Sequence, residues 1–427
     1  MNNKDKIGVI TLGCSKNTVD SERLLSQLKL NEFEIVDAED AETVIINTCG
    51  FIEAAKEESI NTILHATELK NQGKINKVIV SGCLSERYKT ELEKEIPEVD
   101  SFFGTESYKE ILEDLGGDLK YELLGEREIT TPKHYAYLKI SEGCDNPCSF
   151  CAIPIMRGKH KSRIIDDLVF ETELLASKGV KELIIIGQDT TDYGKDIYGK
   201  RNLAELLEKI SLVQGIEWIR LMYAYPSHFP DSVAEMIAYN EKICKYVDIP
   251  LQHISDNVLK SMRRGITKRR TIELLTNLKK KIPNIALRTT FISGYPNESE
   301  KDFEELCDFV KDFEFDRFGV FNYSPEENTH SFEMADPIPN EIKEDRKATL
   351  MEIHKEISEK KNAKFVGGKL KVLIDDFNED YYFARSERDA PEVDCEVLIK
   401  TGNKKYNIGD FYTAEIIDRN EYDLIAI

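Results

Sequence analysis

Three cysteines each follow a short apolar run that has the character of a buried strand. Cys14 ends the stretch VITLGC, Cys49 ends VIINTC and Cys83 ends VIVSGC. In a parallel sheet with right-handed crossovers, successive strands point the same way, so residues that end different strands meet along one edge. One such cysteine would be read as a small buried residue. Three at the same offset predict a common metal site with thiolate ligands.

The lack of a fourth cysteine at this offset indicates which metal group the site suits. Structural zinc is held by four ligands, and catalytic zinc generally includes histidine or carboxylate. A cuboidal iron–sulfur cluster has four irons, so three cysteines leave one iron open to an outside ligand. We therefore expect a 4Fe-4S cluster at this edge, with one position where chemistry can occur.

A second group of cysteines lies within one tight loop. The stretch EGCDNPCSFCAIPIMRG holds Cys144, Cys148 and Cys151 in a C-x3-C-x2-C spacing. Such a loop can place three sulfurs on three corners of a single 4Fe-4S cube, again without a fourth cysteine nearby. Zinc is the alternative, although a zinc loop more often shows paired C-x2-C halves and a matching pair downstream.

Length and composition limit the class of protein that holds these cysteines. The 427 residues are too many for one ordinary core, and the composition is that of a globular protein. No apolar run approaches the roughly 20 residues of a membrane span, and MNNKDK lacks the pattern of a signal peptide, so we expect a cytoplasmic protein with no membrane contact. In a reducing cytosol nine cysteines do not indicate a disulfide framework. The cysteines that stand alone are predicted to be core residues: Cys244, Cys307 and Cys395.

The first cysteine group is positioned by a pattern of alternating strands and helices. Apolar runs at 7–12, 44–46 and 78–80 alternate with helical stretches such as 52–69. This alternation predicts a parallel sheet covered by helices. The passage around Gly116, Gly117 and Gly125 has the composition of a linker. We therefore assign residues 1–118 to an N-terminal α/β domain.

The same alternation resumes after the linker and then gives way to a period of two. Six candidate strands follow one another with room for a helix between each pair: YAYLKIS, ELIIIGQD, WIRLMYAYP, YVDIPLQH, IALRTTFISGYP and RFGVFNYS. This predicts an open, partial (β/α)6 barrel over residues 130–361, with a doubly wound sheet as the alternative. Alternating apolar and polar residues, with turns at Gly402 and Gly409, predict a small antiparallel β-barrel over residues 364–427.

The cysteine loop resembles that of the radical S-adenosylmethionine (SAM) enzymes, whose C-x3-C-x-aromatic-C motif is matched by Cys144, Cys148, Phe150 and Cys151. Four further motifs are similar to those of the methylthiotransferase family, and more closely to its ribosomal-protein branch, the RimO type: GCSKNTVDSE, NTCGFIEAAKEESI, GCLSERY and PLQHISDNVLKSMRRGIT. The resemblance covers nearly the whole chain. It implies an N-terminal cluster domain, a radical SAM core and a terminal TRAM barrel, in that order.

The resemblance implies an enzyme that transfers sulfur-containing groups and uses two 4Fe-4S clusters and SAM as cofactors. In that family one SAM donates a methyl group to sulfur and another yields a 5′-deoxyadenosyl radical. The loop cysteines would then hold the radical-generating cluster, and the strand-end cysteines would hold an auxiliary cluster that carries the sulfur to be inserted. The implied target is an aspartate β-carbon of a small-subunit ribosomal protein. No acid or base side chain can remove so unactivated a hydrogen at neutral pH, and we assign no catalytic residue beyond the cluster ligands.

Residues that end the barrel strands are candidates for cofactor contacts, because ligands collect on the carboxyl face of such barrels. In the superfamily a polar residue after the second strand contacts the methionyl amine, and a glycine turn after the fifth strand packs near the adenosine. Asp189 and Gly294 fit these places, so we expect a cofactor-binding set of Phe150, Gln188, Asp189 and Gly294. Each is alternatively a structural polar group or turn residue. Further strand-end candidates are Tyr223, Tyr225, Gln252 and His253.

Two arginines after the cysteine loop are candidates for anion binding. Arg157 and Arg163 could bind the methionyl carboxylate or an acidic substrate through bidentate hydrogen bonds. Alternatively, both arginines are surface charges.

Charge bears on the choice of substrate, for which the alternative is a transfer-RNA adenosine methylthiotransferase of the MiaB type. The net charge of −21 is spread along the chain, and residues 364–427 hold 9 Lys and Arg against 14 Asp and Glu, a net of −5. A barrel that grips RNA needs a basic face. We therefore expect a basic ribosomal protein as partner, with RNA contact only through the ribosome, together with an external electron donor and a sulfur source. A plain electron carrier with two clusters is a further alternative, but it needs no long barrel.

Overall fold

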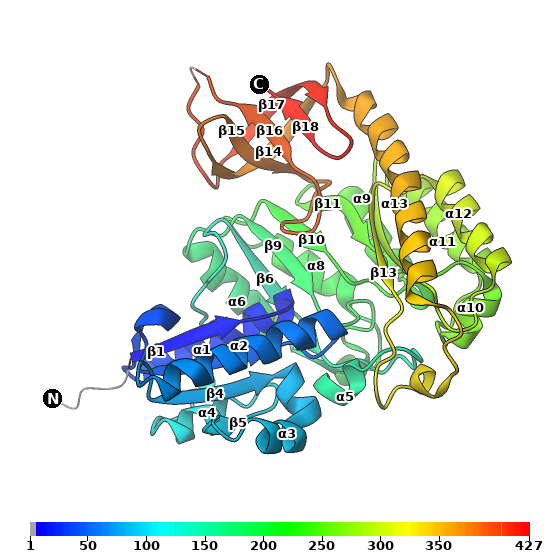
Figure 1. Cartoon of the computed structure of the whole chain (residues 1–427). Helices are drawn as coiled ribbons and strands as arrows, with labels where there is room; N and C mark the ends of the chain where they lie inside the picture. The colour runs from blue at the N-terminus through cyan, green and yellow to red at the C-terminus, as the bar shows by residue number, and fades with distance from the viewer. Residues whose placement is uncertain (1–5, 124, 403) are drawn as a thin grey trace. The chain divides into compact units, whose positions relative to one another are not determined.

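The computed structural model describes residues 6–123, 125–402 and 404–427 (Figure 1). The chain forms two compact units. Unit 1 comprises Met1–Thr131, Tyr137–Asp145 and Cys151–Leu174, and unit 2 comprises Pro132–Ala136, Asn146–Phe150 and Leu175–Ile427. The predicted division into three domains stays a prediction. Within the described ranges, no helix combines the length and the apolar content that crossing a membrane requires.

Unit 1 is built on a five-stranded parallel sheet of order β2-β1-β3-β4-β5. The strands are β1 (Lys6–Thr11), β2 (Glu34–Ile35), β3 (Thr43–Thr48), β4 (Lys77–Gly82) and β5 (Ser101–Phe102). The helices are α1 (Ser15–Leu30), α2 (Glu53–Asn71), α3 (Cys83–Glu95), α4 (Tyr108–Asp114) and α5 (Ile153–Arg157). A short antiparallel pair, β7 (Ser141–Glu142) and β8 (Lys161–Ser162), also belongs to this unit.

Both faces of this sheet are buried, which explains why its strands read as continuous apolar runs. Every residue of β3 is buried. Val44 and Ile46 face one core cluster with residues of α2 and α3, whereas Ile45 faces the other with residues of α1 and α4. The sequence therefore predicted the parallel sheet and its helical cover correctly.

The strand order places the three strand-end cysteines on neighbouring strands. β3 lies between β1 and β4, with Thr11 opposite Asn47 and Thr48 opposite Gly82. The chain order reverses across β1, so the edge beyond its carboxyl end is a topological switch point, where ligands of such sheets bind.

The central region forms a six-stranded sheet of order β13-β12-β11-β10-β9-β6. Its strands are β6 (Tyr135–Lys139), β9 (Glu182–Ile186), β10 (Trp218–Leu221), β11 (Ile243–Asp248), β12 (Ala286–Ser293) and β13 (Arg317–Asn322). All six predicted strands are present and follow one another in sequence order. Because this order has no reversal, the doubly wound alternative is excluded and the open, partial barrel is confirmed.

Helices connect these strands along the chain. They are α6 (Ile165–Ser177), α7 (Lys195–Tyr198), α8 (Leu203–Ser211), α9 (Asp231–Tyr239), α10 (Asp256–Ser261), α11 (Lys268–Lys281), α12 (Glu300–Phe313) and α13 (Asn340–Asn362). One of them begins with a full capping box, in which Ser299 and Asp302 satisfy each other's backbone N–H groups at the start of α12.

The C-terminal region is a closed five-stranded barrel of order β14-β15-β16-β18-β17. Its strands are β14 (Lys369–Phe377), β15 (Tyr381–Ser386), β16 (Val397–Lys400), β17 (Phe411–Arg419) and β18 (Leu424–Ala426). The inward residues form one apolar core, which explains the period of two. One pairing is not antiparallel as predicted: β18 turns back from β17 and closes the barrel parallel to β16.

This barrel is attached to the amino ends of the strands of the central sheet, and both parts belong to unit 2. Trp218, the first residue of β10, packs edge-to-face on Phe411 with ring centroids 4.7 Å apart. Glu182, the first residue of β9, accepts from Arg220 at 2.8 Å and from Arg385 at 2.8 Å. Two similar pairs join β12 and β13 to the barrel segment: Arg288 with Asp394, and Arg317 with Asp389.

Candidate functional site

The carboxyl edge of the unit 1 sheet brings the three strand-end cysteines together. Gly13 has a positive φ of 91°, and a Cβ there would lie 2.9 Å from Cys49 Sγ, so the turn before Cys14 needs a glycine. Cys14 interacts electrostatically with both Cys49 and Cys83. Cys49 and Cys83 are buried and Cys14 is exposed. The predicted meeting of these residues at one sheet edge is therefore present in the fold.

The donor set consists of three cysteines, the ligand type that holds iron–sulfur clusters. Across residues 6–123, 125–402 and 404–427, no three His, Cys, Asp or Glu side chains are arranged to hold one metal ion. A cubane asks for a wider arrangement, because each thiolate bonds to a different iron. Burial raises the pKa of Cys49 and raises that of Cys83 to about 12, so binding of a metal would have to displace a proton from each thiol. Ligation by these cysteines stays a prediction.

The buried side chain of Asn17 fastens the strand ends that lead to the cysteines. Its Nδ2 donates to the carbonyl oxygens of Leu12 at 2.7 Å and Thr48 at 3.0 Å. Asn47 in turn donates to the Asn17 carbonyl oxygen at 3.0 Å. These bonds join the loops after β1 and β3, which carry Cys14 and Cys49.

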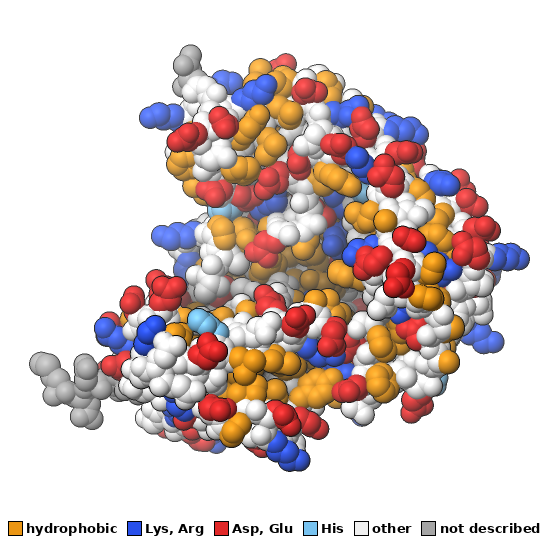
Figure 2. All heavy atoms as spheres, viewed as in Figure 1, with side chains coloured by type: hydrophobic (Ala, Val, Ile, Leu, Met, Phe, Trp, Pro, Cys, Tyr) orange, Lys and Arg blue, Asp and Glu red, His pale blue; other side chains and the backbone are white. Residues whose placement is uncertain are grey.

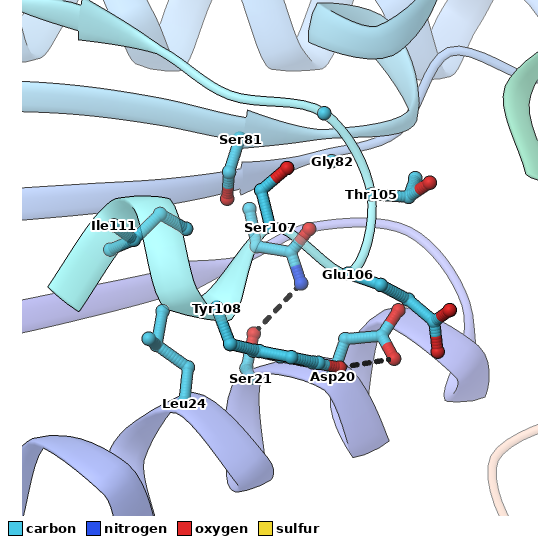
Figure 3. A pocket seen from close by; sticks show the side chains of 12 residues that line it. Asp20, Ser21, Leu24, Ser81, Gly82, Thr105, Glu106, Ser107, Tyr108 and Ile111 are labelled. Atoms are coloured by element: carbon cyan, nitrogen blue, oxygen red, sulfur yellow. Dashed lines mark hydrogen bonds between the residues drawn. The ribbon is translucent and has the colours of Figure 1, made fainter. Parts of the chain in front are cut away.

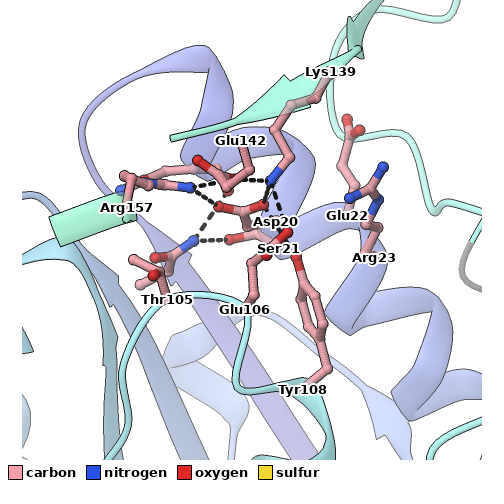
Figure 4. Close-up of polar contacts among 12 residues, drawn as sticks. Asp20, Ser21, Glu22, Arg23, Thr105, Glu106, Tyr108, Lys139, Glu142 and Arg157 are labelled. Carbon is pink, nitrogen blue, oxygen red and sulfur yellow. Dashed lines mark hydrogen bonds and ion pairs between the residues drawn. The ribbon is translucent and has the colours of Figure 1, made fainter. Parts of the chain in front are cut away.

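Arg157, at the end of α5, contacts the third strand-end cysteine. Its Nε donates to Cys83 Sγ at 3.1 Å. Its Nη1 donates to Asp20 at 2.7 Å and to Glu142 at 3.1 Å (Figure 4). Its Nη2 donates to Asn17 Oδ1. The guanidinium is thus buried and directed at Cys83, so it is neither a surface charge nor a free anion-binding group.

Arg163 is likewise engaged within unit 1. Its guanidinium pairs with Glu171 at 2.7 Å and donates to the Lys139 carbonyl oxygen at 3.1 Å. The buried carboxylate of Glu171 also contacts Arg127 at 2.8 Å. The alternative of a surface charge is therefore wrong for this residue too.

A buried ionic cluster surrounds Arg157. Lys139 contacts Asp20 and lies 2.6 Å from Glu142 (Figure 4). Tyr108 donates to Asp20 at 3.0 Å (Figure 3). Burial alone would raise the pKa of Asp20, but Lys139 and Arg157 hold it well below its usual range. The adjoining cavity, of about 20 Å³, has room for about one water molecule and none for a cofactor.

The end of the cysteine loop packs on the strand-end site. Helix α5 starts two residues after Cys151, and Ala152, Ile153 and Met156 form one apolar cluster with Cys83. All of these residues belong to unit 1. The segment that follows Cys151 therefore packs directly on Cys83.

Cys148 lies among residues of unit 2 that follow the central strands. Arg264 Nη1 donates to Cys148 Sγ at 3.3 Å, and the Tyr225 hydroxyl lies 3.6 Å from the same sulfur. Tyr225 donates to the Arg264 carbonyl oxygen at 2.8 Å, and the guanidinium lies 4.3 Å from the centre of the Tyr225 ring. Tyr225 was among the predicted strand-end candidates. Arg264 was missed because it lies in the basic run MRRGITKRR (Met262–Arg270) and no other sequence feature marked it.

Three of the predicted cofactor-binding residues, Gln188, Asp189 and Gly294, follow their strands as expected, whereas Phe150 lies in the cysteine loop. Asp189 is buried and accepts from Thr191 N at 2.9 Å and from Asn146 of the cysteine loop at 2.7 Å. Phe150 packs on the apolar cluster around Tyr295. Gln188 follows β9 and is half-buried. Asp189 thus holds the loop in place, and the binding of SAM by these residues stays a prediction.

The turn at Gly294 is held by a buried carboxylate. Gly294, with φ at 73°, donates its N–H to Glu298 Oε2 at 2.8 Å, and Arg346 contacts Glu298 Oε1 at 2.9 Å. His253 Nε2 lies 3.7 Å from Glu298 Oε2. Burial raises the pKa of Glu298 to about 7 and lowers that of His253 to about 3. Glu298 was missed because its role depends on chain folding after the turn.

Two other strand-end candidates have an unusual backbone. Tyr223 and Gln252 adopt φ values of 59° and 72°. Such conformations are uncommon outside glycine and collect at functional sites. The cysteines predicted for the core are buried at Cys244 and Cys307, whereas Cys395 is half-buried.

An open parallel sheet with a three-cysteine loop beside its strand ends defines a radical SAM enzyme. Residues 138–310 match the Radical SAM superfamily, residues 6–104 match the Uncharacterized protein family UPF0004, and residues 366–427 match the TRAM domain. The fold is similar to that of the radical SAM methyltransferase TsrM from Kitasatospora setae, solved with tryptophan substrate and a SAM analog. That match has a TM-score of 0.57 and 14% identity, and covers 74% of this chain and 72% of that chain.

Curated relatives define the family. The ribosomal protein uS12 methylthiotransferase RimO of Christiangramia forsetii is 54% identical over 99% of this chain and 94% of its own length. That of Cytophaga hutchinsonii is 53% identical over 100% of this chain and 98% of its own length. The chain belongs to the RimO family of methylthiotransferases. It is a radical SAM methylthiotransferase, and the superfamily implies a 4Fe-4S cluster and SAM as cofactors.

Proposed function

We propose that this enzyme inserts a methylthio group at the β-carbon of an aspartate in ribosomal protein uS12. The observation that carries the proposal is the identity of 53–54% to relatives named for that activity, over 99–100% of this chain. The net charge of −5 on residues 364–427 supports a basic protein as the partner rather than RNA. On the face drawn in Figure 2, acidic and basic side chains are interspersed, without one large basic patch.

The proposal includes two 4Fe-4S clusters, one at each cysteine group. When bound, the clusters and SAM would supply the one-electron chemistry that an unactivated C–H bond requires. Cys144, Cys148 and Cys151 would hold the radical-generating cluster. The strand-end cysteines would hold the auxiliary cluster, with Cys49 and Cys83 buried and Cys14 on the exposed side of the site.

The remaining parts of the proposal follow from the substrate. A ribosomal substrate would place the enzyme in the cytoplasm and would allow RNA contact only through the ribosome. An external electron donor and a sulfur source would be needed for turnover. We also propose that the chain works as three domains, at 1–118, 130–361 and 364–427, which lie close to the matched family regions.

Anaerobic reconstitution of the full-length chain tests the two-cluster proposal. We expect about eight irons per chain, and about four after Cys14, Cys49 and Cys83 are all replaced by Ala. The triple variant should still form 5′-deoxyadenosine from SAM but should not modify uS12. About four irons in the unsubstituted chain would contradict the proposal.

Mass spectrometry of a strain that lacks the gene tests the substrate. We expect uS12 to lose the mass of one methylthio group and transfer RNA to keep its own modification. Loss of the mark from transfer RNA alone would support the MiaB-type alternative.

A further inference from the structure

We propose that two buried arginines, Arg157 and Arg264, each donate a hydrogen bond to one cluster-ligating cysteine and thereby set the reduction potentials of the two clusters separately. The inference rests on the proposed function, because it takes Cys83 and Cys148 as cluster ligands. Neither arginine would touch substrate, so both are positioning residues.

Arg157 is held with its Nε directed at sulfur. The side chain is only 7% exposed, and Nε lies 3.1 Å from Cys83 Sγ. Three of its four other N–H donors are occupied by Asp20, Glu142 and Asn17. Because the guanidinium fork is planar and rigid, these three contacts fix the direction of the Nε donor.

Asn17 extends this arrangement to the other two strand ends. The residue that accepts from Arg157 also donates to the backbone before Cys14 and immediately before Cys49. One chain of hydrogen bonds therefore runs from Arg157 to all three loops of the strand-end site. The position of the guanidinium relative to the sulfurs is set by the sheet edge itself.

Arg264 repeats the arrangement in unit 2 with different partners. It is 5% exposed, and its Nη1 lies 3.3 Å from Cys148 Sγ. Its Nη2 donates to the Pro250 carbonyl oxygen at 2.5 Å, and its planar face stacks on the Tyr225 ring. The Tyr225 hydroxyl lies 3.6 Å from the same sulfur. Each cysteine group thus has its own buried arginine.

The physical effect follows from the charge on the ligand. Hydrogen bonds to cluster sulfurs and the local net charge are among the features that set iron–sulfur potentials. A charge-assisted N–H donor is stronger than a neutral one, and burial reduces screening by water. Because reduction adds negative charge to the cluster, a nearby guanidinium favours the reduced state. Loss of either arginine should therefore lower the potential of its own cluster only.

Two full-length backgrounds separate the clusters for measurement. Replacing the three loop cysteines by Ala leaves the strand-end site, and replacing the three strand-end cysteines leaves the loop site. The midpoint potential is then measured by a redox titration followed by electron paramagnetic resonance. We expect Arg157→Gln to shift the midpoint to a more negative value in the first background, and Arg264→Gln to do so in the second.

Each arginine serves as the matched control for the other. Arg264→Gln in the first background and Arg157→Gln in the second should leave the midpoint unchanged. Lysine at either position keeps the positive charge but lacks the fork. Its midpoint should therefore lie between those of the arginine and glutamine forms. If Arg157→Gln fails to fold, combining it with Glu142→Gln removes one of the carboxylates that the guanidinium neutralised.

The outcomes distinguish the inference from the proposed function. If an arginine is replaced by Gln in the background that keeps its own cluster and the midpoint stays unchanged, the assignment for that arginine is overturned. Equal shifts in both backgrounds also overturn it, because they indicate general loosening of the fold. If an unsubstituted background takes up no iron, the proposed cluster at that site fails instead, whatever the arginine does.

Discussion

Replacing Glu182 by Gln should weaken the attachment of the C-terminal barrel to the central sheet. Its carboxylate is fully buried and lies between Arg220 and Arg385, each at 2.8 Å. Gln has nearly the same shape but no charge. The substitution therefore leaves two buried guanidinium groups without the anion between them.

The size of the effect follows from burial. Removing one partner of a buried, hydrogen-bonded ion pair costs roughly 3–5 kcal/mol of unfolding free energy. Each 1.4 kcal/mol or so is a factor of about ten in the folded-to-unfolded ratio, so we expect that ratio to fall by about two to three and a half orders of magnitude. Asp410→Asn is the matched control. That residue pairs with Lys181 in the same region, but both side chains are substantially exposed, and the loss should be below about 1 kcal/mol.

Urea titration followed by tryptophan fluorescence reports on unfolding at the contact between the barrel and the central sheet. The chain has one tryptophan, Trp218, which is buried against Phe411 of the barrel and lies beside Arg220. Its emission should change when the barrel separates from the sheet. We expect the midpoint for Glu182→Gln to fall by about 1 M or more. Equal midpoints for Glu182→Gln and Asp410→Asn would refute the view that these buried charges fix the barrel.

Two further substitutions test the sites. Gly82→Ala should abolish iron binding at the strand-end cysteines and lower the melting temperature by several degrees. Gly82 has a φ of 95°, and the new Cβ would lie 2.4 Å from Asn47 Oδ1 and 2.6 Å from the Thr48 carbonyl oxygen. Unchanged iron content would contradict this prediction. For Glu298, the folded pKa of about 7 exceeds the ordinary value of 4.5, so folding stability should decrease by about 3 kcal/mol as the pH rises through that window. The difference in urea midpoint between wild type and Glu298→Gln should be smaller at pH 5 than at pH 8, because protonated Glu298 resembles Gln.

The spacing of apolar residues predicted the strands and helices because burial of one face determines that spacing directly. The six central strands and their order follow from apolar runs separated by one helix each, and the meeting of Cys14, Cys49 and Cys83 follows from parallel strands of equal direction. Closure of the terminal barrel by a parallel β16–β18 pair could not be predicted, because it depends on the path of the last turn.

Side-chain contacts between residues far apart in the chain could not be predicted from the sequence pattern. Arg157 was a candidate for binding an anion, yet its donors face Cys83, which lies 74 residues earlier. Arg264 is 116 residues from Cys148, and a basic run gave no sign that one of its members is buried. Such contacts depend on which helix returns to which strand end, and hydrophobic spacing carries no information on that choice.

Strand β10 and the loop that follows it separate the terminal barrel from Cys148. Trp218 at its start packs on the barrel, whereas Tyr225, seven residues later, lies beside Cys148. An extended chain rises by about 3.3 Å per residue, so this fixed spacer is at most about 25 Å long. A polypeptide gripped by the barrel would have to reach across that span to present its reacting carbon. A short peptide around the modified residue should then be a poor substrate, however well it fits the reacting end.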